Sequence, residues 1–146
     1  MKLHRTAITR KGPSIPARRL YKDGRLQGRV LDYGCGRGTD SEYYGIQGWD
    51  PYYRAEPHPS GKYDTILCTY VLCILPPGEE SKVISDIEAL LKPGGRAYIT
   101  VRNDIEKEEI TSIAWRRPVN LKLAVLYENT KYKTYILGGI NDRETK

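Results

Sequence analysis

The chain has 146 residues, 39% hydrophobic and 29% charged, which is the composition of a single folded domain and excludes a disordered tail. No apolar run approaches the roughly 20 residues that a membrane span needs, and no signal-peptide core follows the N-terminus. The three cysteines, Cys35, Cys68 and Cys73, lie in apolar segments without metal-ligand spacing. They indicate reduced thiols in a cytoplasmic protein with no metal site.

The net charge of +6 is concentrated at the N-terminus. Residues 1–30 hold nine Lys and Arg against one acid, Asp23, so they carry +8 while the remainder carries −2. Residues 1–28 show no clean helical period and contain Gly12, Pro13 and Pro16, which predicts a basic arm before a domain at 29–146. Two interpretations of this arm stay open. It contacts nucleic-acid phosphates by releasing counterions, or it is a solvated segment that aids solubility.

The first half of the chain alternates short apolar runs with chain breakers, as buried parallel strands do. In chain order we expect a strand at 29–33, a glycine-rich turn at 34–38, a brief helix at 39–44, a strand at 46–49, a loop at 51–62 and a strand at 65–70.

The second half contains the best-defined helix, at 79–91, because its apolar residues form one stripe. We then expect a strand at 96–101, a helix at 104–115, and two strands at 121–127 and 132–137 joined by a turn-like link. This order predicts an α/β fold with a mostly parallel sheet, helices on both faces and a C-terminal antiparallel hairpin.

The glycine-rich turn after the first strand lets a backbone approach a ligand where any Cβ would collide. Asp50 ends the next strand, where an acid can accept hydrogen bonds from ribose hydroxyls. Three details argue against a dinucleotide. The spacing is Gly-x-Gly-x-Gly with Thr39 where a small residue is needed, Asp32 suits an ammonium group, and the acids Asp40 and Glu42 would repel pyrophosphate.

Four motifs together resemble class I S-adenosylmethionine-dependent methyltransferases. They are VLDYGCGRG at 30–38, GWDP at 48–51, YDTI at 63–66 with YVLCIL at 70–75, and LLKPGG at 90–95. The segments TAITR at 6–10 and GWDP resemble more narrowly the small methyltransferase-like proteins of phages and of bacterial DNA phosphorothioation systems. The resemblance implies a Rossmann-like fold, shortened after the second strand, and S-adenosyl-L-methionine as cofactor.

In that family the residues matching Asp32 and the three glycines hold the methionine end of the cofactor, and the residue matching Asp50 holds the ribose. The segment matching 68–70 lies near the transferred methyl group. The cofactor-binding residues that the resemblance predicts are Asp32, Tyr33, Gly34, Cys35, Gly36, Gly38, Asp50, Pro51, Cys68, Thr69 and Tyr70.

The chain departs from the family between Asp50 and Tyr63, where twelve residues leave no room for the usual helix and strand. The adenine pocket is therefore unassigned, with Pro51, Tyr52 and Tyr53 as candidates for its wall. The Asn/Asp-Pro-Pro-aromatic motif of amino-methylating DNA enzymes is also missing after the strand at 65–70, where the chain reads Thr-Tyr-Val-Leu.

Methyl transfer depends mainly on positioning, so few residues are obligatory. Tyr70 is the candidate catalytic residue, as a group that orients the acceptor; the alternative, which the sequence favours, is that it only packs beside the cofactor. Arg10 can reach the cofactor carboxylate or a substrate phosphate. The sequence predicts a methyltransferase acting on nucleic acid or a nucleotide; the alternative is a non-catalytic S-adenosylmethionine-binding regulator or partner subunit.

Overall fold

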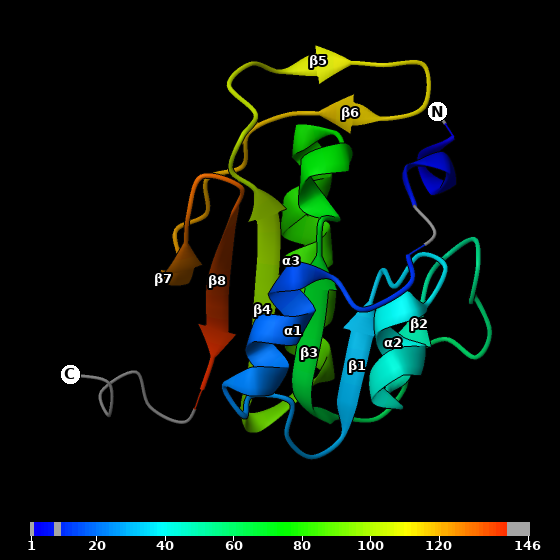
Figure 1. The fold of residues 1–146 in the computed structure, drawn as a ribbon. Helices are drawn as coiled ribbons and strands as arrows, with labels where there is room; N and C mark the ends of the chain where they lie inside the picture. Colours follow the sequence, from blue (N-terminus) through cyan, green and yellow to red (C-terminus); the bar gives the residue numbers. More distant parts are fainter. Residues whose placement is uncertain (1, 8–9, 140–146) are drawn as a thin grey trace.

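A six-stranded sheet with the strand order β2-β1-β3-β4-β8-β7 forms the centre of the protein (Figure 1). The computed structural model describes residues 2–7 and 10–139. The arm expected at 1–28, the motif at 6–10 and the domain expected to end at 146 extend beyond these described residues. The strands are β1 Val30–Tyr33, β2 Gln47–Trp49, β3 Tyr63–Thr69, β4 Leu91–Arg102, β7 Ala124–Glu128 and β8 Tyr132–Gly138.

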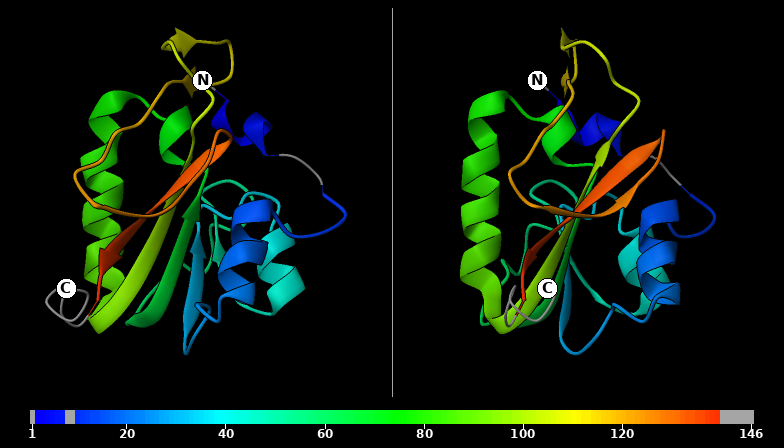
Figure 2. Two further views of the ribbon diagram at one scale, coloured as in Figure 1. Left: turned by 60° about the vertical axis from the view of Figure 1, so that its left-hand side comes forward. Right: turned by 90° about the vertical axis from the view of Figure 1, so that its left-hand side faces the viewer.

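Helices cover both faces of this sheet. Helix α3 (Glu80–Leu90) lies on one face, and α1 (Ile15–Lys22) and α2 (Thr39–Tyr44) lie on the other (Figure 2). Strands β1 to β4 are parallel, whereas β8 runs antiparallel to both β4 and β7. The expected α/β class and C-terminal hairpin are confirmed. None of the helices in the described ranges is long and apolar enough to cross a membrane.

The core has one apolar layer on each face of the sheet. Ile66 and Cys68 of β3 join the layer beneath α3, and Leu67 between them joins the layer beneath α1. Successive side chains of a strand point to opposite faces, so a continuous apolar run fills both layers. Ile87 of α3 and Leu20 of α1 are fully buried, one in each layer.

The N-terminal segment differs from the irregular arm that its composition predicts, because it contains α1. Ser14 begins this helix, its Oγ accepting a hydrogen bond from the Ala17 N–H (3.3 Å), and Pro16 occupies the first turn. A serine cap followed by proline in the first turn is a helix start signal. Leu20 then buries the helix against the sheet.

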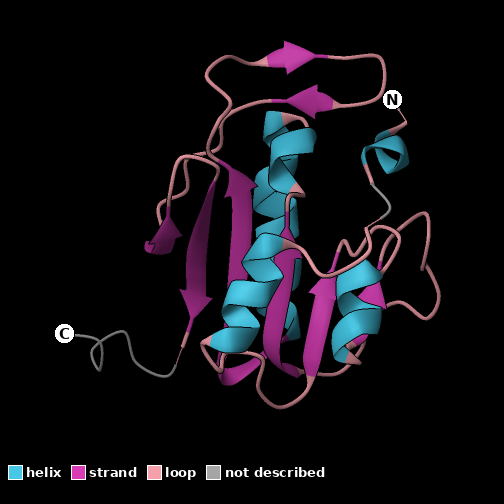
Figure 3. Cartoon of the chain, viewed as in Figure 1, coloured by secondary structure: helices cyan, strands magenta, loops and turns pink. Residues whose placement is uncertain are grey.

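The helix expected at 104–115 is wrong. These residues form a loop and all but the last residue of a small hairpin of β5 (Glu109–Ile110) and β6 (Trp115–Arg116). The Thr111 hydroxyl donates to Ala114 O (2.7 Å) and accepts from the Ala114 N–H (3.0 Å), which closes the turn between the strands. The hairpin and the 3-10 turn η1 (Leu3–Thr6) both lie beyond the carboxyl ends of the parallel strands (Figure 3).

The remaining expected elements are present with shifted ends. Helix α2 occupies the expected residues, whereas β4 begins at Leu91, five residues earlier than expected. Two further 3-10 turns, η2 (Leu72–Ile74) and η3 (Pro77–Glu79), connect β3 to α3. Asn129 Oδ1 accepts hydrogen bonds from the Lys131 and Tyr132 N–H groups (2.8 and 2.9 Å), which fixes the link between β7 and β8.

Candidate functional site

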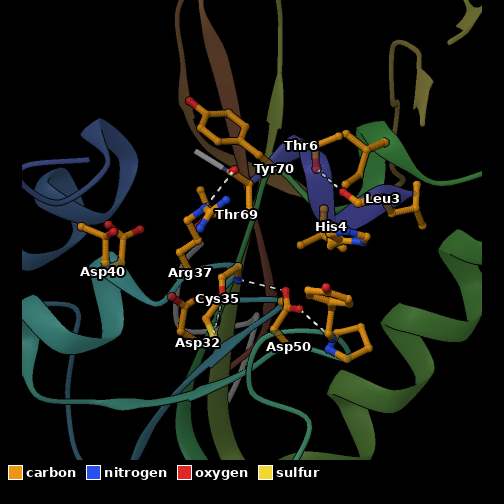
Figure 4. Close-up of a pocket in the computed structure, with 18 of the residues that line it drawn as sticks. Leu3, His4, Thr6, Asp32, Cys35, Arg37, Asp40, Asp50, Thr69 and Tyr70 are labelled. Atoms are coloured by element: carbon orange, nitrogen blue, oxygen red, sulfur yellow. Dashed lines mark hydrogen bonds between the residues drawn. The ribbon is translucent and has the colours of Figure 1, made fainter. Parts of the chain in front are cut away.

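A cavity of about 340 Å³ opens at the carboxyl ends of β1 and β3 (Figure 4). Strand β1 lies beside β3 in the sheet, and the connection from β1 runs to β2 on one side whereas the connection from β3 runs to β4 on the other. Such a switch point leaves a crevice beyond the strand ends, where open α/β sheets bind ligands. Turn η1 forms the wall opposite the sheet, through Leu3, His4 and Thr6.

The floor of the cavity is the glycine-rich turn after β1. The backbone N–H groups of Gly34 and Cys35 both donate to Trp49 O (2.7 and 2.9 Å), which ties the turn to β2. Gly34 has φ 79°, and a Cβ there would lie 2.6 Å from Val71 Cγ2. Glycine is therefore required at this position by both backbone conformation and space.

Asp50 is held at the end of β2 by three backbone donors. Its Oδ1 accepts from the N–H groups of Tyr52 (2.9 Å) and Tyr53 (3.0 Å), and its Oδ2 accepts from the Gly36 N–H (2.9 Å). A carboxylate oxygen can accept two hydrogen bonds. Oδ2 thus keeps acceptor capacity at the cavity, in an orientation fixed by the loop around it.

Three carboxylates, those of Asp32, Asp40 and Asp50, line the same cavity. Burial and the neighbouring Asp40 carboxylate raise the pKa of Asp32 to about 8, with Arg10 partly opposing them. Removing an anion from water and placing it near like charges favours its protonated form. A positively charged group bound beside Asp32 would therefore favour the ionised form of its carboxyl group.

Asp40 also fastens the N-terminal segment to α2. The Ser14 N–H donates to Asp40 Oδ1 (2.6 Å) and the Ser14 hydroxyl donates to Asp40 Oδ2 (2.7 Å). Arg10 lies 3.9 Å from the same carboxylate. These contacts bring Arg10 to the edge of the cavity, where sequence reasoning expected it to meet either a cofactor or a substrate.

Turn η1 closes the side of the cavity where the chain is short. The His4 ring stacks on the Tyr52 ring at 3.7 Å with an interplanar angle of 7°, and the Tyr53 hydroxyl donates to His4 O (3.3 Å). Pro51 and Tyr52, two of the expected wall residues, line the cavity, whereas Tyr53 supports it from outside. The N-terminal segment thus packs on the short loop that follows Asp50.

Most of the expected cofactor-binding residues come together at this cavity. Those that line it are Asp32, Gly34, Cys35, Gly36, Asp50, Pro51, Thr69 and Tyr70. The Thr69 hydroxyl is buried and has no hydrogen-bond partner within the described part of the chain. An orphaned buried hydroxyl is costly unless a ligand satisfies it, so Thr69 fits a site that a polar ligand completes.

Tyr33, Gly38 and Cys68 lie outside the lining. The Tyr33 side chain points to the opposite face of β1, where its hydroxyl donates to Asp86 of α3 (2.6 Å). Cys68 is fully buried beneath α3, where burial raises the pKa of its thiol. Gly38 begins α2 in a left-handed conformation (φ 85°). Because successive side chains of a strand alternate between its faces, those of Tyr33 and Cys68 point away from the cavity.

Sequence reasoning missed a second group of lining residues, which are Leu3, His4, Thr6, Ala7, Arg37, Thr39, Asp40, Val71, Ile74 and Leu75. Asp40 carried a signal, as an acid directly after the glycine turn. The residues of η1 carried none, because their place depends on the long-range Ser14–Asp40 contacts.

Tyr70 separates this cavity from a second one of about 620 Å³ and lines both. Its φ of 60° is a left-handed conformation that is costly for an aromatic residue and that concentrates at functional sites. Burial raises the pKa of Tyr70 to about 12 and that of the Cys35 thiol to about 12. Both groups therefore stay neutral at physiological pH.

Comparisons with known proteins agree with this geometry. The family model described as a methyltransferase domain matches residues 7–134. Burkholderia thailandensis 1,6-didemethyltoxoflavin-N1-methyltransferase, solved with 1,6-didemethyltoxoflavin and S-adenosylhomocysteine, is similar over 87% of this chain and 78% of its own, with TM-score 0.64 and 17% identity.

Two further solved structures share the fold. A Pyrococcus horikoshii OT3 protein matches with TM-score 0.60 and 14% identity over 84% of this chain and 86% of its own. Magnesium protoporphyrin IX methyltransferase from Synechocystis PCC 6803 was solved with bound S-adenosylmethionine. It matches with TM-score 0.50 and 19% identity over 83% of this chain and 74% of its own. No curated protein matches the chain significantly. The chain belongs to the methyltransferase domain family, whose cofactor is S-adenosyl-L-methionine.

Proposed function

We propose that this protein transfers a methyl group from S-adenosyl-L-methionine to a nucleic acid or a nucleotide. The observation that carries the proposal is the junction of two cavities at Tyr70. They share Thr6, Arg10, Tyr70 and Ile74, so a donor in one and an acceptor in the other would meet there. Adjacent sites of this kind turn a bimolecular reaction into a positioned one.

The residues around the smaller cavity fit the cofactor group by group. Asp32 would hold its ammonium group, Asp50 Oδ2 the ribose hydroxyls, and the backbone of the glycine turn the methionine chain. The bound cofactor would supply an electrophilic methyl group. A lone pair of the acceptor would form the new bond to this methyl group, and the electron pair of the broken methyl–sulfur bond would stay on sulfur. The acceptor would then release a proton to solvent.

The protein itself contributes position more than acid–base chemistry. The neutral Tyr70 hydroxyl and the protonated Cys35 thiol are poor bases at pH 7, because burial raises both pKa values to about 12. The Tyr70 side chain, which lines both cavities, would orient an acceptor that already carries a nucleophilic lone pair.

A nucleic-acid or nucleotide acceptor is supported by the charge of α1. Its exposed face carries Arg18, Arg19 and Lys22, and the helix contains no acid. Such a face can bind phosphates by counterion release. The narrower resemblance to methyltransferase-like proteins of phages and DNA phosphorothioation systems points the same way.

The test is transfer of a tritiated methyl group to separate pools of duplex DNA, single-stranded DNA, RNA and nucleoside monophosphates. We expect incorporation into one of these pools and its loss in Asp50→Ala. Glu88→Ala, an exposed position on α3, is the matched control and should keep wild-type activity. Incorporation only into protein or neutral small molecules would contradict the proposed acceptor.

One observation favours the alternative of a non-catalytic binder. Residues 51–62 form a short loop without the helix and strand usual in the family, and η1 occupies that side. This alternative predicts that S-adenosylhomocysteine binds while no acceptor pool gains tritium. Methyl transfer to any pool rules it out.

A further inference from the structure

We infer that the larger cavity beside Tyr70 binds an acceptor made of a flat aromatic ring and one anionic group, a phosphate or a carboxylate. The inference rests on the proposed function in that it takes this cavity as the acceptor site. It goes further by assigning the chemistry that the site recognises and the residues that recognise it.

The larger cavity is lined by charged side chains of one sign only. Asp32, Asp40 and Asp50 line the smaller cavity together with Arg10 and Arg37, whereas the charged residues of the larger one are Arg10, Arg102 and Arg116. The larger cavity has no Asp or Glu among its described lining residues. Clefts lined by one sign of charge concentrate ligands of the opposite sign. The larger cavity thus favours an anion.

Two of the three arginines make no hydrogen bond to a carboxylate within the described ranges. Arg116 Nη1 lies 3.9 Å from Glu109 Oε2, and Arg10 Nη1 lies 3.9 Å from Asp40 Oδ1, which Ser14 already occupies. Arg102 differs, because it binds Asp104 through two hydrogen bonds of 2.9 and 2.8 Å. Arg10 and Arg116 therefore have donors for the planar, bidentate contact that guanidinium makes with carboxylates and phosphates.

Most of the remaining lining is apolar or aromatic. Ile105, Ile113 and Trp115 contribute together with Tyr70 and Ile74. Aromatic rings gain about 0.5–1.5 kcal/mol from offset or edge-on contacts beyond the area they bury. A volume of about 620 Å³ lies in the range of small-ligand clefts, roughly 300–1,000 Å³. One ring system with a charged substituent fits this combination.

The wall that carries Trp115 and Arg116 is fixed to the fold. Arg117, which follows it in the chain, is buried and donates to Leu75 O (2.7 Å) and Leu72 O (3.1 Å) next to η2. It also pairs with Glu80 of α3. These bonds hold β6 against the carboxyl end of the sheet, so the site is built before a ligand arrives.

The experiment measures binding by calorimetry in the presence of saturating S-adenosylhomocysteine, with two matched ligand pairs. Adenosine 5′-monophosphate is compared with adenosine, and indole-3-carboxylate with indole-3-carboxamide. We expect the anionic member of at least one pair to bind at least ten-fold tighter at low salt. The pair that shows the difference identifies the anion as phosphate or carboxylate.

The substitution Arg116→Gln should reduce this difference to three-fold or less, and Arg116→Lys should restore part of it. Lys82→Gln, an exposed charge on α3, is the control and should leave it unchanged. If S-adenosylhomocysteine binds, two results would overturn the inference: equal affinity for the anionic and neutral ligands of both pairs, or an affinity difference that stays undiminished in Arg116→Gln. If the wild-type protein does not bind S-adenosylhomocysteine, the proposed function is overturned instead.

Discussion

Asp32 shows how a residue of this site can serve binding at the expense of stability. Its carboxyl group is 3% exposed, and burial beside Asp40 raises its pKa from 3.8 to about 8. Between these values the unfolded chain has lost the proton that the folded protein retains. Folding then takes up a proton, so the free energy of unfolding falls as pH rises from about 4 to 8.

The substitution Asp32→Asn should therefore stabilise the cofactor-free protein. At pH 7 we expect the free energy of unfolding to rise by about 2 kcal/mol, because the amide needs no protonation. Urea unfolding at pH 5 and pH 8 checks this: wild-type stability should fall between the two, and the variant should fall less. Identical pH profiles for the two proteins would contradict the buried, protonated Asp32. The same variant should bind S-adenosylmethionine more weakly, since it cannot pair with an ammonium group.

Single residues of the site were predictable where the signal is local. Asp32, Gly34 and Asp50 follow from a strand, its turn and the end of the next strand. Tyr33 and Cys68 were misplaced because the resemblance selects consecutive residues, whereas consecutive side chains of a strand face opposite ways. His4 was out of reach, because its stacking on Tyr52 depends on the path of the N-terminal segment.

At the scale of elements, the packing of α1 on the sheet distinguishes a basic N-terminus that is part of the fold from one that is a separate arm. Leu20 is fully buried against Leu67 and Tyr98, so truncating it should leave a cavity. Leu20→Ala should lower the free energy of unfolding by about 2–4 kcal/mol, measured by urea unfolding. Ile15→Ala, at a side chain 72% exposed on the same helix, should change it by less than about 0.5 kcal/mol. A neutral Leu20→Ala would mean that α1 does not pack on the sheet.

Ser14 links α1 to the floor of the cofactor cavity. Its hydroxyl caps the helix and donates to Asp40, so Ser14→Ala removes a cap and leaves a buried carboxylate with one donor fewer. We expect a loss of about 1–2 kcal/mol in the free energy of unfolding. Ser85→Ala, exposed on α3, is the matched control and should be neutral. If both variants unfold at the same urea concentration as wild type, the Ser14–Asp40 anchor does not exist.

The two elements that the sequence misjudged failed for different reasons. The segment at 15–22 has a serine cap and proline that signal a helix start, but the flanking Gly12 and Pro13 and the lack of apolar period obscured it. The segment at 104–115 has helix-like charge patterning, and the Thr111 turn overrides it. Strands β1 and β3 and helix α3 were predictable because the apolar residues that define their sequence patterns pack in the core of the fold.

For the whole molecule, the central feature is a proposed donor cavity and a proposed acceptor cavity that are both lined by Tyr70, whose backbone is left-handed. Three aspartates in the first cavity and an acid-free, arginine-containing lining in the second would place a cationic donor and an anionic acceptor side by side. Turn η1, through the stacking of His4 on Tyr52, lines one side of the first cavity. The N-terminal segment thus forms part of the proposed cofactor site.

The most direct test is a calorimetric titration of S-adenosylhomocysteine into the wild-type protein, Asp50→Ala and the control Glu88→Ala. One saturable site is expected in the wild type and in Glu88→Ala. In Asp50→Ala, the loss of the carboxylate that orients the Gly36 turn and faces the ribose should weaken binding at least ten-fold. Absence of saturable binding to the wild type, or equal affinity in Asp50→Ala, would contradict the assignment of this cavity to the cofactor.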